Sequence, residues 1–302
     1  MYYYSLNEYL KKEFGQKVYK ISLNGNMGCP NRDGTIGIGG CIFCSSGGSG
    51  DFAPSGFMPI GEQIENAKQR IKSKYDGDKY IAYFQAYTNT YAPVSYLKEL
   101  FEKVIDRDDI VAVSIATRPD CLQDDVIDLI EKLNNKKPVW IELGLQTSNE
   151  STARYIRRGY KNECFEIAVR KLKKIGVHIV AHIILGLPNE SEQDILGTAN
   201  YVAHSGVSGI KIQLLHILND TDLYLDYQKG VFDALTMEQY IDLLCKVIER
   251  LPQDMVVHRI TGDGPKKLLV APLWSGDKKR VLNNINQKFL KINLKQGRLF
   301  EA

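Results

Sequence analysis

The sequence predicts an α/β fold in which parallel strands form a partial, TIM-like barrel of the (βα)6 type, followed by a carboxy-terminal extension. Strand and helix patterns alternate along most of the 302 residues. The strand segments are continuous apolar runs, which is typical of parallel strands that helices cover on the outside. Polar loops follow five of these runs. Because such loops gather on one rim of a barrel, we expect an active site there.

The alternation gives six or seven βα units. We expect strands at residues 17–23, 80–87, 110–118, 139–146, 177–187, 209–218 and 256–261. Between them, apolar residues recur at steps of three and four, which places one apolar face on each helix. The expected helices lie at 60–75, 96–105, 126–133, 151–176, 195–203 and 237–251. We expect residues 1–262 to form the barrel and 263–302 to form a basic extension with one helix.

Composition places the chain among folded proteins, since 44% of its residues are apolar and 25% are charged. The net charge is only +3, but it is unevenly distributed. Residues 266–302 contain nine basic and two acidic residues, including Lys278, Lys279 and Arg280. A cationic segment of this kind suits a polyanionic partner, and the alternative is a solvated face of a terminal helix.

No apolar run approaches the roughly 18–20 residues that a membrane-spanning helix needs. The amino terminus also lacks a long apolar stretch before a small-residue cleavage site. We therefore expect a cytoplasmic protein without a membrane segment.

Three of the six cysteines lie within sixteen residues: Cys29, Cys41 and Cys44. Clustered thiols in a reducing compartment are more often metal ligands than disulfides. A zinc site would need a fourth ligand, and the nearest candidates, Cys121 and His178, lie on other elements. Three cysteines fit a [4Fe–4S] cluster in which one iron keeps an open position.

An iron with an open position can bind the amino and carboxylate groups of S-adenosylmethionine. An electron from the cluster can then cleave the sulfonium and yield a 5′-deoxyadenosyl radical, which must be sheltered from water. A barrel with a filled interior supplies that shelter.

The run CPNRDGTIGIGGCIFC resembles the cysteine loop of a bacterial subgroup of the radical S-adenosylmethionine (SAM) superfamily, with Phe43 at the aromatic position before the last cysteine. The gap of eleven residues between the first two cysteines exceeds the commonest spacing by eight. Similarly long gaps occur in this subgroup and in the Elongator catalytic subunit. The segment from Thr117 to Asp120, TRPD, also resembles that subunit.

The resemblance implies further contacts with SAM. In oxygen-independent coproporphyrinogen oxidase and its relatives, strand four ends in a Gly-X-Gln whose glutamine contacts the ribose, and an arginine twelve residues later binds the carboxylate. Those positions are Gln146 and Arg158 here. His182 stands where the family has a ribose-binding acid, four residues before the Gly-Leu-Pro that begins at Gly186. Gln85 and Thr117 are further candidates for this site.

The resemblance implies a radical SAM enzyme that modifies tRNA, converting wobble 5-carboxymethylaminomethyluridine to 5-aminomethyluridine. Candidate substrate contacts are His216, His258, Arg259, Lys278, Lys279 and Arg280. Flavodoxin or ferredoxin is the expected kind of electron donor. Two alternatives remain at this point: a radical enzyme for a small metabolite, as in porphyrin decarboxylation, and a zinc-stabilised RNA-binding module without catalysis.

Overall fold

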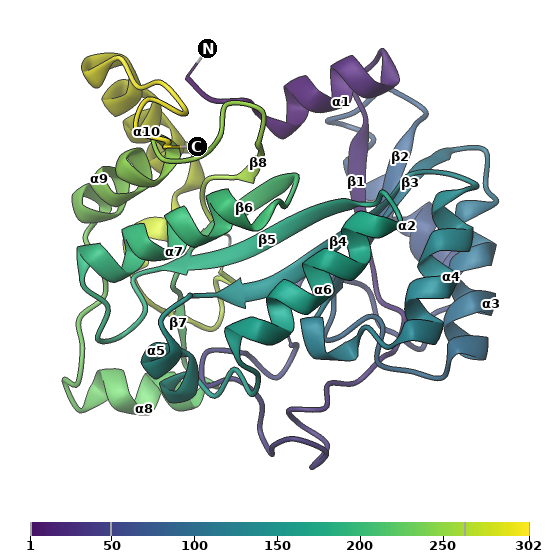
Figure 1. Cartoon of the computed structure of the whole chain (residues 1–302), viewed down its shortest axis with the longest axis horizontal. Helices are drawn as coiled ribbons and strands as arrows, with labels where there is room; N and C mark the ends of the chain where they lie inside the picture. Colours follow the sequence, from purple (N-terminus) through teal and green to yellow (C-terminus); the bar gives the residue numbers. More distant parts are fainter. Residues whose placement is uncertain (1, 49, 263, 302) are drawn as a thin grey trace.

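A seven-stranded parallel sheet that curls into half of a barrel forms the centre of the molecule (Figure 1). The computed structural model describes residues 2–48, 50–262 and 264–301, so positions 1, 263 and 302 at the ends of the two expected segments lie outside the described residues. The predicted α/β partial barrel is confirmed, with seven strands in place of six. Their spatial order is β1 (Tyr19–Leu23), β2 (Tyr80–Phe84), β3 (Ile110–Thr117), β4 (Val139–Gln146), β5 (His178–Leu185), β6 (Gly209–Leu214) and β8 (Val256–Arg259).

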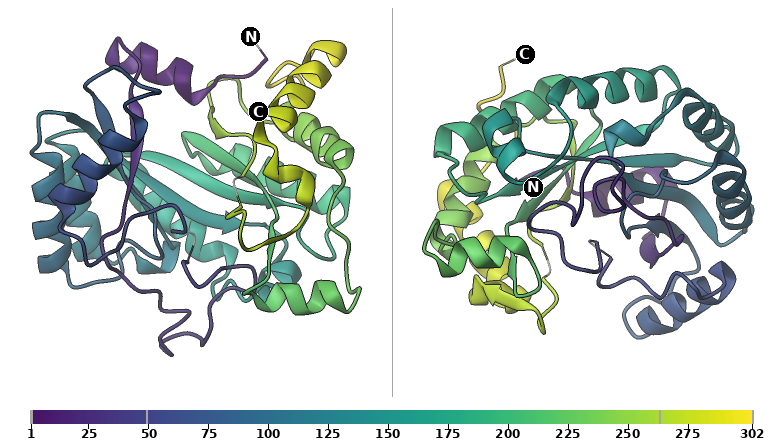
Figure 2. Two further views of the ribbon diagram at one scale, coloured as in Figure 1. Left: turned by 180° about the vertical axis from the view of Figure 1, so that it is seen from behind. Right: turned by 90° about the horizontal axis from the view of Figure 1, so that it is seen from below.

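Helices connect successive strands and cover the outer face of the sheet (Figure 2). All five residues of β2 are buried, which explains why the strands read as unbroken apolar runs. Phe101, Phe165 and Leu244 supply buried side chains to the layer between helices and sheet. The connecting helices are α2 (Ile60–Ile71), α3 (Val94–Ile105), α4 (Asp124–Asn134), α6 (Asn162–Lys174), α7 (Glu192–Ser205) and α9 (Met237–Ile248).

Shorter elements lie in the loops that follow the strands. A two-stranded antiparallel ribbon joins the segment after β6 to the segment after β8. The ribbon strands are β7 (Ile217–Leu218) and β9 (Leu269–Ala271); the helices are α5 (Glu150–Tyr155), α8 (Asp222–Gln228) and the 3-10 turns η1 (Pro119–Cys121) and η2 (Leu273–Gly276).

Helix α1 (Leu6–Phe14), which we did not predict, closes the amino-terminal end of the barrel. A capping box between Ser5 and Glu8 begins it, and this Ser-x-x-Glu pattern is visible in the sequence. Leu10 packs against a cluster of buried side chains at or near the starts of the strands, including Ile81 and Trp140. The end opposite to the polar loops is thereby sealed.

His258 lies in this sealed end and not at the rim where we expected it. Its Nε2 is 3.0 Å from Nε2 of His178, and both rings contact the Trp140 ring. The strand β8 is short and pairs with β6 from Gly209 onward, so His258 stands near the beginning of the sheet. It does not line the cavity described below, so the structure does not place this residue with the other predicted site residues.

We expect the protein to lose stability as the pH falls from about 6.5 toward 4. Burial, with repulsion from Lys20, lowers the pKa of His178 to about 4 and that of His258 well below its usual value. The unfolded chain binds protons near pH 6.5 while these folded imidazoles stay neutral, so acid favours unfolding, by up to about 3 kcal/mol for His178. Urea midpoints measured against pH should therefore change less steeply in His178→Asn.

His204, exposed on α7, provides the matched control for this titration. His204→Asn should retain the acid-dependent fall. An equal slope in His178→Asn and in the unsubstituted protein would contradict the assignment of the fall to the buried pair.

The carboxy-terminal helix α10 (Lys278–Ile292) packs on α9 beside the barrel (Figure 1). Its buried residues Val281, Ile285 and Phe289 belong to the main core, so the predicted extension shares the core of the barrel. Lys288 of this helix forms an ion pair with Asp242 at 2.5 Å, and Arg298, which follows the helix, pairs with Glu249. None of the described helices combines the length and the apolar character that a membrane crossing requires.

Candidate active site

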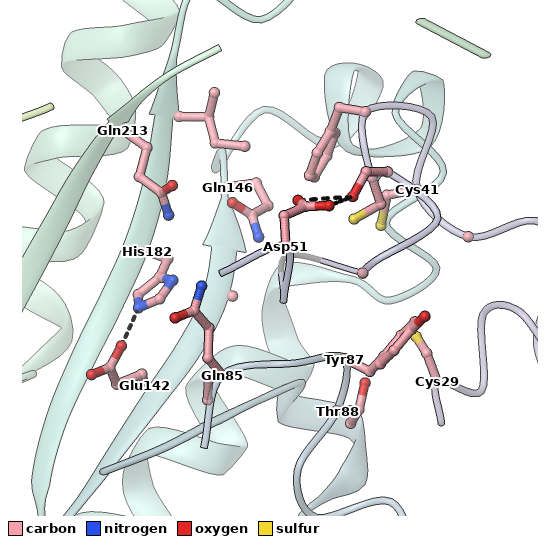
Figure 3. Close-up of a pocket in the computed structure, with 18 of the residues that line it drawn as sticks. Cys29, Cys41, Asp51, Gln85, Tyr87, Thr88, Glu142, Gln146, His182 and Gln213 are labelled. Atoms are coloured by element: carbon pink, nitrogen blue, oxygen red, sulfur yellow. Dashed lines mark hydrogen bonds and ion pairs between the residues drawn. The ribbon is translucent and has the colours of Figure 1, made fainter. Parts of the chain in front are cut away.

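A cavity of about 400 Å³ opens at the carboxyl ends of the strands (Figure 3). All seven strands of the sheet contribute side chains to it, and the cysteine loop forms part of its wall. The predicted site residues that line it are Cys29, Cys41, Phe43, Cys44, Gln85, Thr117, Gln146, Arg158, His182, His216 and Arg259. Lys278, Lys279 and Arg280 are exposed in the first turn of α10 and do not line it.

Backbone contacts hold the cysteine loop in a compact shape. The carbonyl of Cys29 accepts from the amide of Arg32 at 2.9 Å, and that of Cys41 accepts from the amide of Cys44 at 3.0 Å. Asn31 ties the loop to the segment after α5 by donating to the carbonyl of Arg157 at 2.6 Å. Gly40 has φ +84°, and a Cβ there would lie 2.8 Å from Nε of Arg32. The glycine is thus required for the bend that brings Cys41 to the cavity.

The environment of Cys41 favours the thiolate, the form that binds metals. A hydrogen bond with Cys44 and the charge of Arg118 lower the pKa of Cys41 to about 7 against the opposing effect of burial. Three thiols that share one cavity have the donor chemistry of an iron–sulfur cluster. Over the described ranges, the structure contains no group of three or more His, Cys, Asp or Glu side chains placed to hold a single metal ion.

Neither sequence candidate for a fourth zinc ligand reaches the cavity. Cys121 is buried in η1, where burial raises its thiol pKa to about 12. His178 lies at the sealed end of the barrel beside Trp140. The geometry therefore offers the three thiols no fourth ligand from either residue.

Gln146 ends β4 with an unusual backbone conformation and an unsatisfied side-chain oxygen. Its φ is +69°, in the left-handed region that few residues other than glycine adopt. Its Oε1 is buried and has no hydrogen-bond partner in the protein. A Cβ on Gly144 would approach Nε2 of Gln146 to 2.9 Å, so the glycine makes room for this amide. Such an unsatisfied buried acceptor at a cavity wall suits a ligand hydroxyl, as the ribose prediction requires.

Arg158 is buried and holds the turn after β4 together through hydrogen bonds. The side chain is 1% exposed, and all five of its N–H donors bond to the protein. Nη1 donates to the carbonyls of Leu145 and Thr147, Nε and Nη2 donate to that of Tyr160, and Nη2 also donates to Oδ1 of Asn162, at 2.7–3.0 Å. This arrangement differs from the expected carboxylate-binding role, because no donor of the guanidinium is left for a ligand.

The remaining predicted residues that line the cavity are held by different neighbours. Thr117 shares a hydrogen bond of 2.5 Å with Thr90, and Gln85 accepts from Ser22 at 3.0 Å. His216 is enclosed by Gly262 and Gly264, where a Cβ would come within 3.0 Å of its ring. Arg259 pairs with Lys211 in the β6–β8 register and lines the cavity beside it.

A buried ionic cluster that we did not predict forms the floor of the cavity. Glu142 of β4 has no exposed surface and contacts Lys20 of β1 at 2.6 Å and Lys211 of β6. Nε2 of His182 is 2.8 Å from its carboxylate (Figure 3). Burial raises the pKa of Glu142, but the two lysines more than compensate and hold it well below its usual value. The sequence contains a clue to this cluster: charged residues stand inside the apolar strands KVYKISL, VWIELGLQ and GIKIQLL, and buried charges need partners.

Comparison with known proteins agrees with this architecture. Residues 26–202 match the radical SAM superfamily, and residues 207–291 match the Radical_SAM C-terminal domain. The protein YtqA of Bacillus subtilis is 47% identical over 299 residues, which cover 99% of this chain and 93% of YtqA. A tRNA-2-methylthio-N(6)-dimethylallyladenosine synthase of Fusobacterium nucleatum is 32% identical over 48% of this chain and 34% of its own.

Among solved structures, the archaeal Elp3 of Methanocaldococcus infernus shares the fold with a TM-score of 0.71 at 17% identity. The alignment covers 92% of this chain and 64% of the Elp3 chain. The predicted relationship to the Elongator subunit is therefore confirmed at the level of the fold. Since the family match extends over more than half of its length, the chain belongs to the radical SAM superfamily.

Proposed function

We propose that this protein modifies tRNA, converting wobble 5-carboxymethylaminomethyluridine to 5-aminomethyluridine by removal of the carboxymethyl group. The carbon between nitrogen and carboxylate would lose one hydrogen atom to the 5′-deoxyadenosyl radical and one electron back to the cluster. Hydrolysis of the resulting C=N bond would then release the group as glyoxylate. The observation that carries the proposal is a single cavity that joins three cysteines at its mouth to a charged floor inside a partial barrel. Radical SAM enzymes use a [4Fe–4S] cluster and SAM, and both cofactors fit the residues around this cavity.

Cys29, Cys41 and Cys44 would hold the cluster, and Gln146 would accept a hydrogen bond from the SAM ribose through its buried Oε1. Together these cofactors supply a 5′-deoxyadenosyl radical that takes hydrogen from carbon. The protein contributes orientation and limits access of water, because α1 seals the far end of the barrel and the cysteine loop forms part of the cavity wall.

Two observations support tRNA as the substrate. The relative from Fusobacterium nucleatum is named as a tRNA-modifying enzyme. Lys278, Lys279 and Arg280 form the exposed first turn of α10, where their charge opposes the positive end of the helix dipole. Phosphate groups of an RNA backbone would relieve this repulsion, and the resulting affinity would depend on salt. We assign the reaction to the cytoplasm, with flavodoxin or ferredoxin as the electron donor.

Wobble nucleosides from cells that lack the gene test the proposal by mass spectrometry. We expect 5-carboxymethylaminomethyluridine to accumulate and 5-aminomethyluridine to disappear. The unsubstituted gene should restore the product, and Cys41→Ala should not, because the cluster would lose a ligand. Cys164→Ala is the matched control, since Cys164 lies on α6 outside the cavity. Unchanged wobble nucleosides in the deletion strain would refute the proposed reaction, and a metabolite change in their place would favour the small-molecule alternative.

A further inference from the structure

The ionic cluster at the floor of the cavity holds more positive groups than negative ones. Two ammonium groups, from Lys20 and Lys211, contact the single carboxylate of Glu142. The side chain of Lys211 is 8% exposed and that of Lys20 is 17% exposed, so solvent screens neither of them well. An excess charge in such a place is costly unless a further partner neutralises it.

Three further side chains that contact the cluster are neutral, and Arg259, which lines the cavity beside Lys211, adds another positive charge. Ser114 donates its hydroxyl to Glu142 at 2.6 Å. Burial lowers the pKa of His182 to about 4, which leaves the imidazole uncharged near neutral pH. Tyr83 accepts from Nζ of Lys211 at 3.2 Å, and burial with the charge of Glu142 raises its pKa well above the usual value. None of these three side chains therefore offsets the second ammonium group.

Lys211 is the member of the pair that faces the cavity. It lines the cavity together with the three cysteines, whereas Lys20 does not. Its Nζ carries three donors, of which Tyr83 and Glu142 take two. Burial, together with the charges of Lys20 and Arg259, lowers the pKa of Lys211 to about 7 in spite of Glu142. A bound anion would stabilise the charged form of this side chain.

We propose that Lys211 binds the carboxylate of the substrate at the floor of the cavity and thereby selects the substrate over the product. The assignment rests on the proposed function, in which the modified side chain of the base ends in a carboxymethyl group. The carboxylate offers Lys211 a charge-assisted hydrogen bond. Loss of that group leaves an ammonium ion, which the same floor repels. One residue thus favours entry of the substrate and departure of the product.

Nucleoside binding to the cluster-reconstituted, SAM-loaded protein tests the assignment by calorimetry. The probes are 5-carboxymethylaminomethyluridine and its methyl ester, which differ in the carboxylate charge. We expect the ester to bind about tenfold more weakly to the unsubstituted protein. Lys211→Met should remove this preference and Lys211→Arg should retain it. Lys103→Met, on the exposed face of α3, is the matched control and should behave as the unsubstituted protein.

Equal affinity of the unsubstituted protein for the acid and the ester would overturn the assignment even if Lys211→Met failed to fold. A folded Lys211→Met that still prefers the acid would do the same. Folding is expected to survive this substitution, because Glu142 keeps its contacts with Lys20, Ser114 and His182.

A second measurement separates this assignment from the tRNA reaction. Malonate at 10–20 mM, compared with sodium chloride of equal ionic strength, should raise the melting temperature of the unsubstituted protein and of Lys103→Met, but not that of Lys211→Met. Such a shift without binding of either nucleoside would support a carboxylate site and refute the proposed substrate. Equal affinity for the acid and its ester, together with no malonate shift, would refute the carboxylate site without contradicting the tRNA reaction.

Discussion

Glu142→Gln is expected to lower the free energy of unfolding by about 3–5 kcal/mol, the usual effect of removing one partner from a buried ionic cluster. The carboxylate has no exposed surface and is the shared contact of Lys20 and Lys211. A neutral amide leaves Lys20 and Lys211 without a counter-charge, so each must either stay charged in a poorly solvated place or give up its proton. Urea denaturation of the cofactor-free protein at pH 7.5 measures the effect independently of activity.

Glu99→Gln is the matched control, because Glu99 pairs with Lys103 at 2.6 Å on the exposed surface of α3 and should contribute little. Lys211→Met combined with Glu142→Gln should recover part of the lost stability by removing one uncompensated charge. If Glu142→Gln unfolded at the same urea concentration as Glu99→Gln, the cluster would not have the buried, coupled character that we assign to it.

Arg158→Met is expected to destabilise the cofactor-free protein by about 3–5 kcal/mol. The substitution leaves the carbonyls of Leu145, Thr147 and Tyr160 without their side-chain donor, and each unsatisfied buried acceptor costs about 1–3 kcal/mol. Arg158→Lys should also be destabilising, since a single ammonium cannot reproduce a planar group that donates in five directions. Thermal melting without SAM measures this structural role.

Arg154→Met provides the control, because Arg154 is exposed on α5 four residues away. The opposite outcome is equally informative: an Arg158→Met protein that melts as the unsubstituted protein does, yet fails to bind SAM, would restore the carboxylate-binding role predicted from the sequence. SAM binding measured on the refolded variants distinguishes the two roles.

The cysteine loop is an example of a feature that local sequence alone predicts. Cys29, Cys41 and Cys44 lie within sixteen residues, and the glycine at position 40 is required by a bend inside the same segment. A metal-binding loop of this kind depends on the spacing of its residues along the chain, which the sequence shows directly. The barrel could be predicted for a similar reason, because strands covered on both faces must be apolar throughout.

Arg158 and His258 show where that reasoning fails. The position of Arg158 suggested a ligand contact, but its donors are consumed by three carbonyls and an amide that the turn after β4 brings around it. His258 follows an apolar run like the other strands, yet β8 pairs with only the first part of β6. Hydrogen-bond satisfaction and strand register are properties of the folded chain, and neither has a pattern in the sequence.

The ionic floor shows most clearly which features follow from the sequence and which from the tertiary fold. Lys20, Glu142 and Lys211 are charges within apolar strands, so their burial could be inferred from the residues alone, together with the thiol cluster and the α/β barrel. Their mutual contact could not, because β1, β4 and β6 are separated by more than 60 residues along the chain at each step. Curling of the sheet brings their side chains together inside the barrel, and electrostatic partners at that separation are chosen by the tertiary fold.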